Sequence, residues 1–270
     1  MDTDSDLLSL RGVTWNVLNQ AYIRDQYTHV VDRSVLAWDY RLPLIIEILS
    51  SFKADVLFLQ EVELKTAAAD FRDLFDTYDY SVHEVSKKRS SHMGNMTLWK
   101  KSVFSLKLSV SNSYGLHVVL LHRSSGLSVW FSNVHLKGGT TSGLEQRSQQ
   151  LTSCLKMVSK HCSSNSSVHR CIVGDFNDEM KETGPSFALL HASGYSCVES
   201  PISSTINNRS FRFDRIVSTK EVEVVYSAKG SLATSEVTNE EGETPAKDML
   251  IPSPAIPSDH VPIEFVIRIQ

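Results

Sequence analysis

The chain alternates short apolar segments with polar ones, and most apolar segments have the composition and length of β-strands. The last of them, His260–Ile269, partly alternates apolar and polar residues, as a half-buried strand does. So many strands along one chain predict a protein with sheets at its centre. Strands are expected at Leu10–Leu18, Asp55–Gln60, Ser81–Val85, Asn95–Trp99, His117–His122, Ser128–His135, Arg170–Gly174, Phe211–Val217, Glu221–Tyr226 and His260–Ile269.

Three segments have helical patterns instead. The first, Asp39–Phe52, places its apolar residues on one stripe, with Pro43 tolerated if it lies in the first turn. A second helix is expected to begin at Ser142, which forms a capping box with Glu145. The third, Pro185–Ala192, starts with a proline and is followed by a glycine. The stripe of the first helix consists of Tyr40, Leu44, Ile45, Ile48, Leu49 and Phe52.

The chain contains no internal repeat and no break in composition that would mark a domain boundary. We therefore expect a single catalytic domain over residues 1–270, of the α/β class, with helices outside its sheets. Two polar segments, Ser86–Gly94 and Ser227–Lys247, are expected to be mobile loops because they are poor in apolar residues.

Composition limits how the protein can bind a polyanion. Hydrophobic residues make up 41% and charged residues 21% of the chain, and the formal net charge is −4. Phosphate chemistry must therefore depend on a local site or a bound cation, since no global positive field exists. The acidic segment Met1–Leu10 lacks an apolar signal core, and no apolar run reaches the ~20 residues of a membrane span. We expect no membrane association and a cytoplasmic or nuclear location.

Five short polar clusters stand at the ends of strand-like segments, where sheet proteins commonly build their sites. Together they supply amides, carboxylates and histidines. Magnesium prefers carboxylate oxygens, keeps several waters and completes its octahedron with phosphate oxygens, so this set suits a magnesium-dependent phosphoesterase. The clusters are Thr14–Asn16, Gln60–Glu63, Asn133–His135, Gly174–Asn177 and Ser258–His260.

Each cluster also has a purely structural interpretation. Glu61 could be a solvated strand end, Asp175 and Asn177 could form an Asx turn, and His135 could be a buried histidine with its hydrogen bonds satisfied. Asp259 and His260 could belong to a plain turn. All these interpretations would have to hold at once, whereas one chemistry explains every cluster.

The same clusters, in this order, resemble the endonuclease/exonuclease/phosphatase superfamily over nearly the whole chain. The segments Asn16–Leu18 and Leu36–Glu63 further resemble its carbon-catabolite-repressor deadenylase and nocturnin branch. The resemblance implies a four-layer α-β-β-α sandwich with two mixed sheets flanked by helices. It also implies dependence on Mg²⁺, with Mn²⁺ as a substitute, and 3′-to-5′ exonuclease action on single-stranded RNA, often poly(A).

The resemblance assigns the metal to Glu61 as principal ligand, with Asn16 beside it and Asp259 as a further ligand. Asp175 and Asn177 would orient the attacking water and the phosphate. These residues are the core of the implied hydrolytic centre.

The resemblance also assigns the histidines. His135 would donate to a non-bridging phosphate oxygen, and His260 would act as general base or as a phosphate-stabilising cation. Asp259 would hold His260, while Asp214 would fix a neighbouring histidine. In physical terms, a carboxylate beside an imidazole sets its tautomer and stabilises its charged form.

Substrate contacts are expected from Asn133, from Phe176 as a stacking surface, and from the basic loop Lys87, Lys88 and Arg89. The basic loop could equally be an ordinary solvated loop. Met93 stands where the branch usually has an aspartate, which weakens the inference of poly(A) preference.

Two alternatives to the exoribonuclease remain. One is a nucleotide phosphatase or an enzyme like 5′-tyrosyl-DNA phosphodiesterase; the sequence around Arg212–Ile216 also resembles the latter. The other is a non-catalytic binding module with the same fold, which the presence of Glu61, Asp175 and His260 disfavours.

Overall fold

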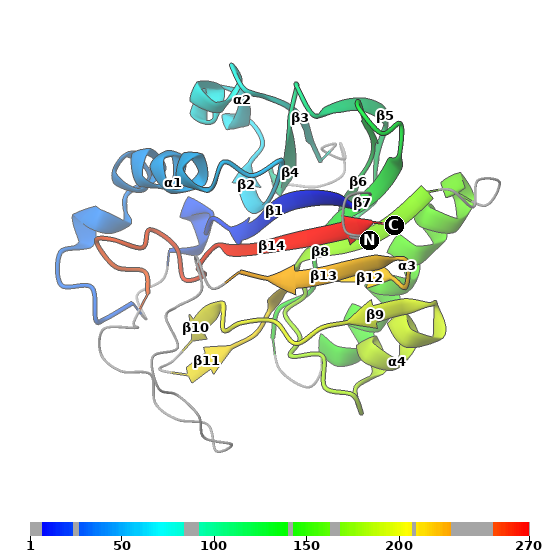
Figure 1. Cartoon of the computed structure of the whole chain (residues 1–270). Helices are drawn as coiled ribbons and strands as arrows, with labels where there is room; N and C mark the ends of the chain where they lie inside the picture. The colour runs from blue at the N-terminus through cyan, green and yellow to red at the C-terminus, as the bar shows by residue number, and fades with distance from the viewer. Residues whose placement is uncertain are drawn as a thin grey trace.

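The computed structural model describes residues 7–23, 27–83, 92–139, 143–162, 168–206, 209–227 and 251–269. Two six-stranded sheets lie at the centre of the molecule, and helices lie outside them (Figure 1). The helices are α1 (Trp38–Phe52), α2 (Ala67–Asp70), α3 (Gly143–Cys162) and α4 (Pro185–Ala192), with short 3₁₀ turns at Gln20–Tyr22, Arg33–Leu36 and Arg72–Leu74.

Both sheets are mixed. The first has the order β13-β14-β1-β2-β4-β3, in which β1 and β2 are parallel and the other neighbours antiparallel. Its strands are β1 (Leu8–Asn16), β2 (Val56–Glu63), β3 (Tyr78–Val82), β4 (Met93–Lys100), β13 (Val222–Tyr226) and β14 (Ile263–Ile269).

The second sheet has the order β5-β6-β7-β8-β12-β9, with β7 and β8 parallel and the other neighbours antiparallel. A two-stranded ribbon, β10 (Ser204–Ile206) and β11 (Arg209–Phe211), lies apart from both sheets. The strands of the second sheet are β5 (Phe104–Ser111), β6 (Gly115–His122), β7 (Ser128–His135), β8 (Val168–Asp175), β9 (Tyr195–Cys197) and β12 (Asp214–Thr219).

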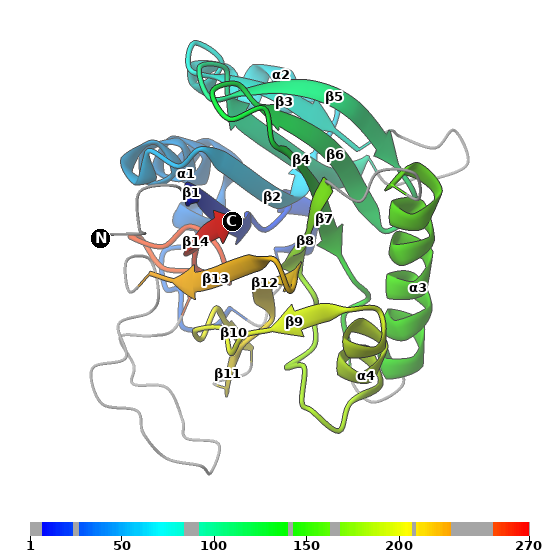
Figure 2. The same ribbon diagram turned by 45° about the vertical axis from the view of Figure 1, so that its right-hand side comes forward.

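The main core fills the space between the sheets. Phe58 of the first sheet packs against Phe131 of the second, with ring centroids 5.2 Å apart. On the outer faces, Ile45 of α1 is buried against the first sheet and Leu151 of α3 against the second. Figure 2 shows α1 and α3 on opposite sides of the paired sheets. The expected four-layer sandwich with two mixed sheets is confirmed.

The helices agree with the sequence pattern except in detail. Pro43 was expected in the first turn of α1, but it is the sixth residue of the helix and lies beyond that turn. The carbonyl that loses its partner belongs to the exposed Asp39, which water can reach. The second helix covers Gly143–Cys162, and its expected cap Ser142 lies outside the described residues. The third helix has the predicted bounds.

The predictions missed several strands, among them β5 and β9. These two form the edges of the second sheet, and β5 is partly exposed along its length, so neither has the apolar signal of a central strand. The expected loop Ser86–Gly94 is wrong at its end, because Met93 and Gly94 begin β4. Residues 84–91 and 228–250, which contain most of both expected loops, lie outside the described residues.

The topology brings four strand ends to one edge of the sandwich. Because β1 and β2 are parallel, Asn16 lies opposite Gln60 at the end of that pair. In the same way His135 lies opposite Asp175 at the end of β7 and β8. The antiparallel strand β12 then places Asp214 beside Asp175. Within the described part of the chain, no helix is long and apolar enough to cross a membrane.

Candidate active site

Glu61 sits in a β-bulge, where the pairing of β2 with β4 shifts between Leu59 and Val62. Its φ of 60° is left-handed, a conformation that costs a non-glycine residue on the order of 1–3 kcal/mol. The carboxylate accepts hydrogen bonds from the backbone N–H of Asn19 (2.9 Å) and from Nδ2 of Asn16 (3.0 Å). The bulge and these two donors fix the carboxylate at the strand end.

Asn16 connects the two sheets through its amide. Its Nδ2 lies 3.0 Å from Oε1 of Glu61 and 3.0 Å from Oδ2 of Asp175, so the same amide group donates to both carboxylates. Its Oδ1 accepts from the N–H of Leu18, which defines the orientation of the amide. These hydrogen bonds position the two carboxylates, and the expected role of Asn16 as a metal ligand stays a prediction.

Asp175 ends β8 and is 1% exposed. Its Oδ1 accepts from the N–H of Asn177, so the Asx turn considered from the sequence exists and Oδ2 remains directed toward Asn16. The preceding Gly174 has a φ of 134°, and a Cβ there would lie 2.1 Å from the carbonyl oxygen of Val134. Only glycine allows the close approach of β7 and β8 that sets the position of Asp175.

Two histidines face the same carboxylate. Nε2 of His135 lies 3.7 Å from Oδ2 of Asp175 and 3.8 Å from Oε1 of Glu61. Nε2 of His260 lies 3.8 Å from Oδ2 of Asp175. We refer to Asn16, Glu61, His135, Asp175 and His260 as the candidate cluster.

His260 is held by Asp214. Its Nδ1 lies 2.6 Å from Oδ2 of Asp214, and both side chains are buried. Burial alone would lower the pKa of His260, but the carboxylates of Asp214 and Asp175 and the hydrogen bond to Asp214 outweigh it, and the pKa is well above its usual value. The imidazole is thus kept as a cation whose Nε2 faces the cluster.

The assignment of Asp259 as the partner of His260 is wrong. Its Oδ2 accepts from the hydroxyl of Tyr27, at 2.9 Å. The hydrogen-bond partner of His260 is Asp214, which β12 brings beside it. The ligand atoms of Asp175, Asp214 and His260 lie within 4.8 Å of one another. Asp259 does not belong to this group.

Comparison with known proteins agrees with this geometry. Residues 13–260 match the model of the Endonuclease/Exonuclease/phosphatase family. The chain belongs to this family. The predicted resemblance to this family is confirmed.

The family relatives include protein angel homolog 2. The mouse protein is 28% identical over 194 residues, which cover 64% of this chain and 35% of the mouse protein. The human protein is 33% identical over 102 residues, covering 37% and 18% of the two chains. The chain thus spans about a third or less of these relatives.

Solved structures of the family share the fold. The crystal structure of ANGEL2, described as a 2′,3′-cyclic phosphatase in complex with adenosine-2′,3′-vanadate, has a TM-score of 0.74 at 18% identity, covering 98% of this chain and 97% of ANGEL2. The human nocturnin catalytic domain has a TM-score of 0.66 at 18% identity, covering 98% and 97%. Truncated TDP2 from Caenorhabditis elegans has a TM-score of 0.61 at 19% identity, covering 96% and 97%.

The divalent metal that the family uses fits the residues present. In the group formed by Asp175, Asp214 and His260, the facing atoms of Asp214 and His260 are paired with each other. Both side chains are almost fully buried. The Glu61 side chain is 12% exposed, which leaves room for the waters that a hard cation such as Mg²⁺ retains. Glu61 would therefore hold the ion, with Asp175 next to it.

Two expected substrate contacts are wrong. Asn133 is fully buried, donates to the carbonyls of Leu59 and Met96, and accepts from Nε2 of Gln60, so it joins the two sheets instead of reaching a substrate. Phe176 is fully buried in the core beneath α3 and α4 and offers no face to a base. The basic residues Lys87, Lys88 and Arg89 lie outside the described residues.

Arg41 is a site residue that the sequence interpretation missed. It is fully buried and donates to the carbonyls of Val17 and Pro257, which belong to the segments that carry Asn16 and His260. Burial lowers the pKa of its guanidinium to about 10. A signal was present, because Arg41 stands four residues before the core residue Ile45 and so shares its helix face.

Proposed function

We propose that the protein hydrolyses phosphodiester bonds at the 3′ end of single-stranded RNA, as a magnesium-dependent 3′-to-5′ exoribonuclease in which Mn²⁺ can replace Mg²⁺. The observation that carries the proposal is the convergence of Glu61, Asp175, His135 and His260 on one point, with separations of 3.7 to 3.8 Å between the histidine and carboxylate atoms. The RNA end as substrate is supported by the resemblance to the nocturnin branch.

The role of each side chain in the cluster follows from its charge. Asp175 accepts a hydrogen bond from the attacking water, because Oδ2 faces both histidines and Oδ1 is held by the Asn177 N–H. His260, kept cationic by Asp214, and His135 donate to non-bridging phosphate oxygens. Mg²⁺ held by Glu61 would supply neutralisation of phosphate charge and a lower pKa for a bound water.

Asn16 keeps the two carboxylates apart and oriented. Its Nδ2 donates to the carboxylate of Glu61 in the first sheet and to that of Asp175 in the second. Two anions that are not bridged would repel each other in this buried site. The amide therefore supports a fixed geometry before the substrate arrives, which is the condition for effective electrostatic stabilisation.

Removal of a 2′,3′-cyclic phosphate from an RNA end is the second candidate. It is favoured by the match to protein angel homolog 2 in sequence and to ANGEL2, described as a 2′,3′-cyclic phosphatase, in fold. Both reactions attack phosphorus at the last nucleotide, so the same cluster would serve either. The fully buried Phe176 removes one reason to expect tight binding of further bases.

One substrate panel separates these functions. A 5′-labelled oligoribonucleotide with a free 3′ end should give a ladder of shorter products with Mg²⁺ and remain intact in excess chelator, and DNA of the same sequence should be cut more slowly. An RNA ending in a cyclic phosphate that loses it without shortening would favour the second candidate. Turnover of a 5′-tyrosyl-DNA end or a small nucleotide phosphate with intact RNA would contradict both, and no turnover of any substrate would indicate a binding module.

A further inference from the structure

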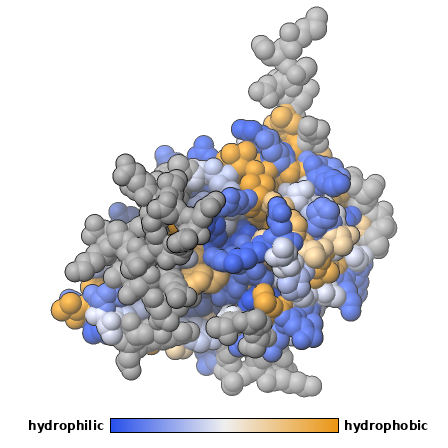
Figure 3. Space-filling view, turned by 90° about the horizontal axis from the view of Figure 1, so that it is seen from below, coloured by the Kyte–Doolittle hydropathy of each residue, from blue (hydrophilic) through white to orange (hydrophobic). Residues whose placement is uncertain are grey.

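Hydrophilic side chains lie across the middle of the face of the molecule that is seen from below (Figure 3). Asn133 and Gln60 are polar as well, but both are fully buried between the two sheets. A buried amide is unfavourable unless its hydrogen bonds are made. The partners of these two amides therefore identify the part of the backbone that they hold.

The amide of Asn133 lies against the pair of residues next to the β-bulge of β2. Its Nδ2 is 3.2 Å from the carbonyl oxygen of Leu59 and 3.0 Å from that of Met96. Leu59 and Met96 form the last pair of β2 and β4 before the register of these strands shifts. One side chain of the second sheet thus holds both strands of the first sheet at the point where the bulge begins.

Two further amides fix Asn133 itself. Gln60, the first residue of the bulge, donates from Nε2 to Oδ1 of Asn133 at 2.8 Å. Asn95, which stands on β4 opposite the bulged residues, donates from Nδ2 to the backbone carbonyl of Asn133 at 2.7 Å. Because carbonyl oxygens only accept hydrogen bonds, the contacts with Leu59 and Met96 determine which end of the Asn133 amide faces the bulge.

The bulge determines where the carboxylate of Glu61 lies. Glu61 has a φ of 60°, and a left-handed conformation of a residue other than glycine persists only where the surrounding contacts enforce it. Without the bulge, the pairing of β2 would move by one residue and the carboxylate would leave the candidate cluster. Its Oε2 accepts from the N–H of Asn19 at 2.9 Å, so this hydrogen bond reports on the position of the carboxylate.

We propose that Asn133 is a positioning residue for the divalent cation: from the second sheet it holds the bulge that places the Glu61 carboxylate, and it thereby sets the affinity of the site for the ion. The inference rests on the proposed role of Glu61 in holding the ion, and it does not depend on RNA as the substrate. Groups that orient a metal ligand commonly change metal affinity by about 10–100-fold when they are substituted. Asn133 thus acts on the ion without touching it.

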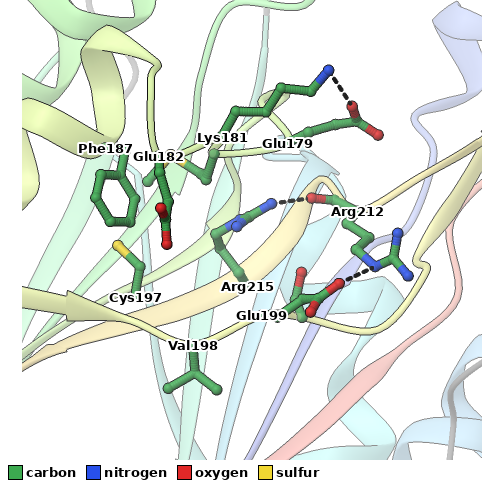
Figure 4. Close-up of a pocket in the computed structure, with 11 residues that line it drawn as sticks. Glu179, Lys181, Glu182, Phe187, Cys197, Val198, Glu199, Arg212 and Arg215 are labelled. Carbon is green, nitrogen blue, oxygen red and sulfur yellow. Dashed lines mark hydrogen bonds and ion pairs between the residues drawn. The ribbon is translucent and has the colours of Figure 1, made fainter. Parts of the chain in front are cut away.

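A pocket with carboxylates in its lining provides a control site elsewhere in the molecule. It has a volume of about 340 Å³ and lies between α4, the end of β9 and the start of β12, with Arg215 in its lining (Figure 4). Its carboxylates are Glu179, Glu182 and Glu199, and its lining shares no residue with the bulge or the candidate cluster. Glu182→Gln therefore removes a carboxylate without altering the contacts of Asn133.

A titration of the whole protein with Mn²⁺, followed by electron paramagnetic resonance without substrate, tests the proposal. Asn133→Ser removes the donor to the carbonyls of Leu59 and Met96, and it should weaken Mn²⁺ binding by at least about tenfold. Gln60→Met keeps the volume of the side chain and removes the hydrogen bond to Oδ1 of Asn133, so it should also weaken binding. This second variant carries the test if Asn133→Ser does not fold.

Phe131→Leu is the matched control for stability. Phe131 precedes Asn133 by two residues on β7 and packs against Phe58 between the sheets, so its substitution loosens the same core without touching the bulge. Phe131→Leu and Glu182→Gln should both bind Mn²⁺ with the affinity of the unchanged protein. Urea unfolding checks that each variant is folded.

Hydrogen exchange in the absence of metal provides a second readout. The N–H of Asn19 should exchange at least about tenfold faster in Asn133→Ser, because its acceptor, the Glu61 carboxylate, moves. The hydrogen-bonded N–H of Asp55, just before the other end of β2, should exchange at its usual rate. In Phe131→Leu the ratio of the two exchange rates should equal that of the unchanged protein.

Several results would overturn the proposal. One is a normal Mn²⁺ affinity or a normal ratio of exchange rates in folded Asn133→Ser, or in Gln60→Met if the first variant does not fold. An equal loss of affinity in Phe131→Leu would assign the effect to stability alone. Loss of Mn²⁺ binding in Glu182→Gln, or no binding by the unchanged protein, would remove the ion from Glu61. The expected Mn²⁺ results in a protein that leaves RNA intact would instead contradict only the proposed reaction.

Discussion

Nδ1 of His260 lies 2.6 Å from Oδ2 of Asp214, although the two residues are 46 positions apart in the sequence. His260 precedes β14 of the first sheet, and Asp214 begins β12 of the second. The hydrogen bond thus links the two sheets beside Asp175. The reacting end of the imidazole, Nε2, is 3.8 Å from Oδ2 of Asp175.

This relationship predicts that substitutions of Asp214 and of Asp259 change kcat to different extents. Asp214→Asn should lower kcat by at least about 10²-fold, the usual scale for a positioned proton-transfer group, because the amide cannot stabilise the imidazolium of His260. Asp259→Asn should change kcat much less, since Asp259 bonds to Tyr27. Steady-state kinetics on the RNA substrate compares them, with His260→Ala as reference. Equal losses at positions 214 and 259 would contradict the pairing.

Glu61 is expected to be essential for the metal. Glu61→Gln keeps the shape of the side chain and removes the charge that attracts a hard cation, so turnover should be lost while the fold persists. Chelator should abolish the activity of the unchanged protein, and Mg²⁺ or Mn²⁺ should restore it. The exposed Glu223, paired with Arg268 on the surface, provides the control substitution Glu223→Gln. Full activity in excess chelator would remove the metal from the mechanism.

Arg41 is expected to position the site from beneath. Arg41→Met leaves the carbonyls of Val17 and Pro257 without donors, and should destabilise the protein by about 3 kcal/mol or more. It should also lower kcat by about 10²-fold at a temperature where the variant is fully folded, because the segments bearing Asn16 and His260 shift. Arg41→Lys keeps the charge but loses the planar fork, so its effect should be intermediate. Normal kcat in folded Arg41→Met would exclude the positioning role.

His117 is expected to make stability depend on pH. It is fully buried with Nδ1 2.9 Å from Oγ of Ser132, and burial, with smaller contributions from His83 and His161, lowers its pKa to about 4. In the unfolded chain His117 takes up a proton near pH 6.5, whereas in the folded protein it stays neutral at that pH. The free energy of unfolding therefore decreases as the pH falls below about 6.5. Between pH 7.5 and 5.0 the loss should be about 2 kcal/mol.

Urea unfolding of the protein and of His117→Gln at both pH values measures this loss. The glutamine retains a polar group toward Ser132 and does not titrate, so the variant should lose about 2 kcal/mol less than the parent between the two pH values. The exposed His191 supplies the control His191→Gln, which should behave like the parent. The same pH dependence in all three proteins would show that His117 is not the titrating group.

The sequence by itself predicted sheets at the centre with helices outside them, and the resemblance to the family implied the four layers. Strand-like segments ending in polar residues indicated a site that includes Glu61, His135, Asp175 and His260. The apolar stripe expected for α1 contains the buried residues Ile45, Leu49 and Phe52, but Tyr40 at its start is exposed. These are local patterns with a fixed structural period, so they can be read without coordinates.

Only the tertiary structure decided which side chains touch. Asp259 stands next to His260 in sequence, but the sheet packing gives His260 to Asp214 and leaves Asp259 to Tyr27. Asn133 and Phe176 occur within site motifs and are nevertheless fully buried, because Asn133 bonds to the facing sheet and Phe176 packs in the core with residues of α3 and α4. The pocket around Arg215 likewise arises from segments distant in sequence, for which no local pattern exists.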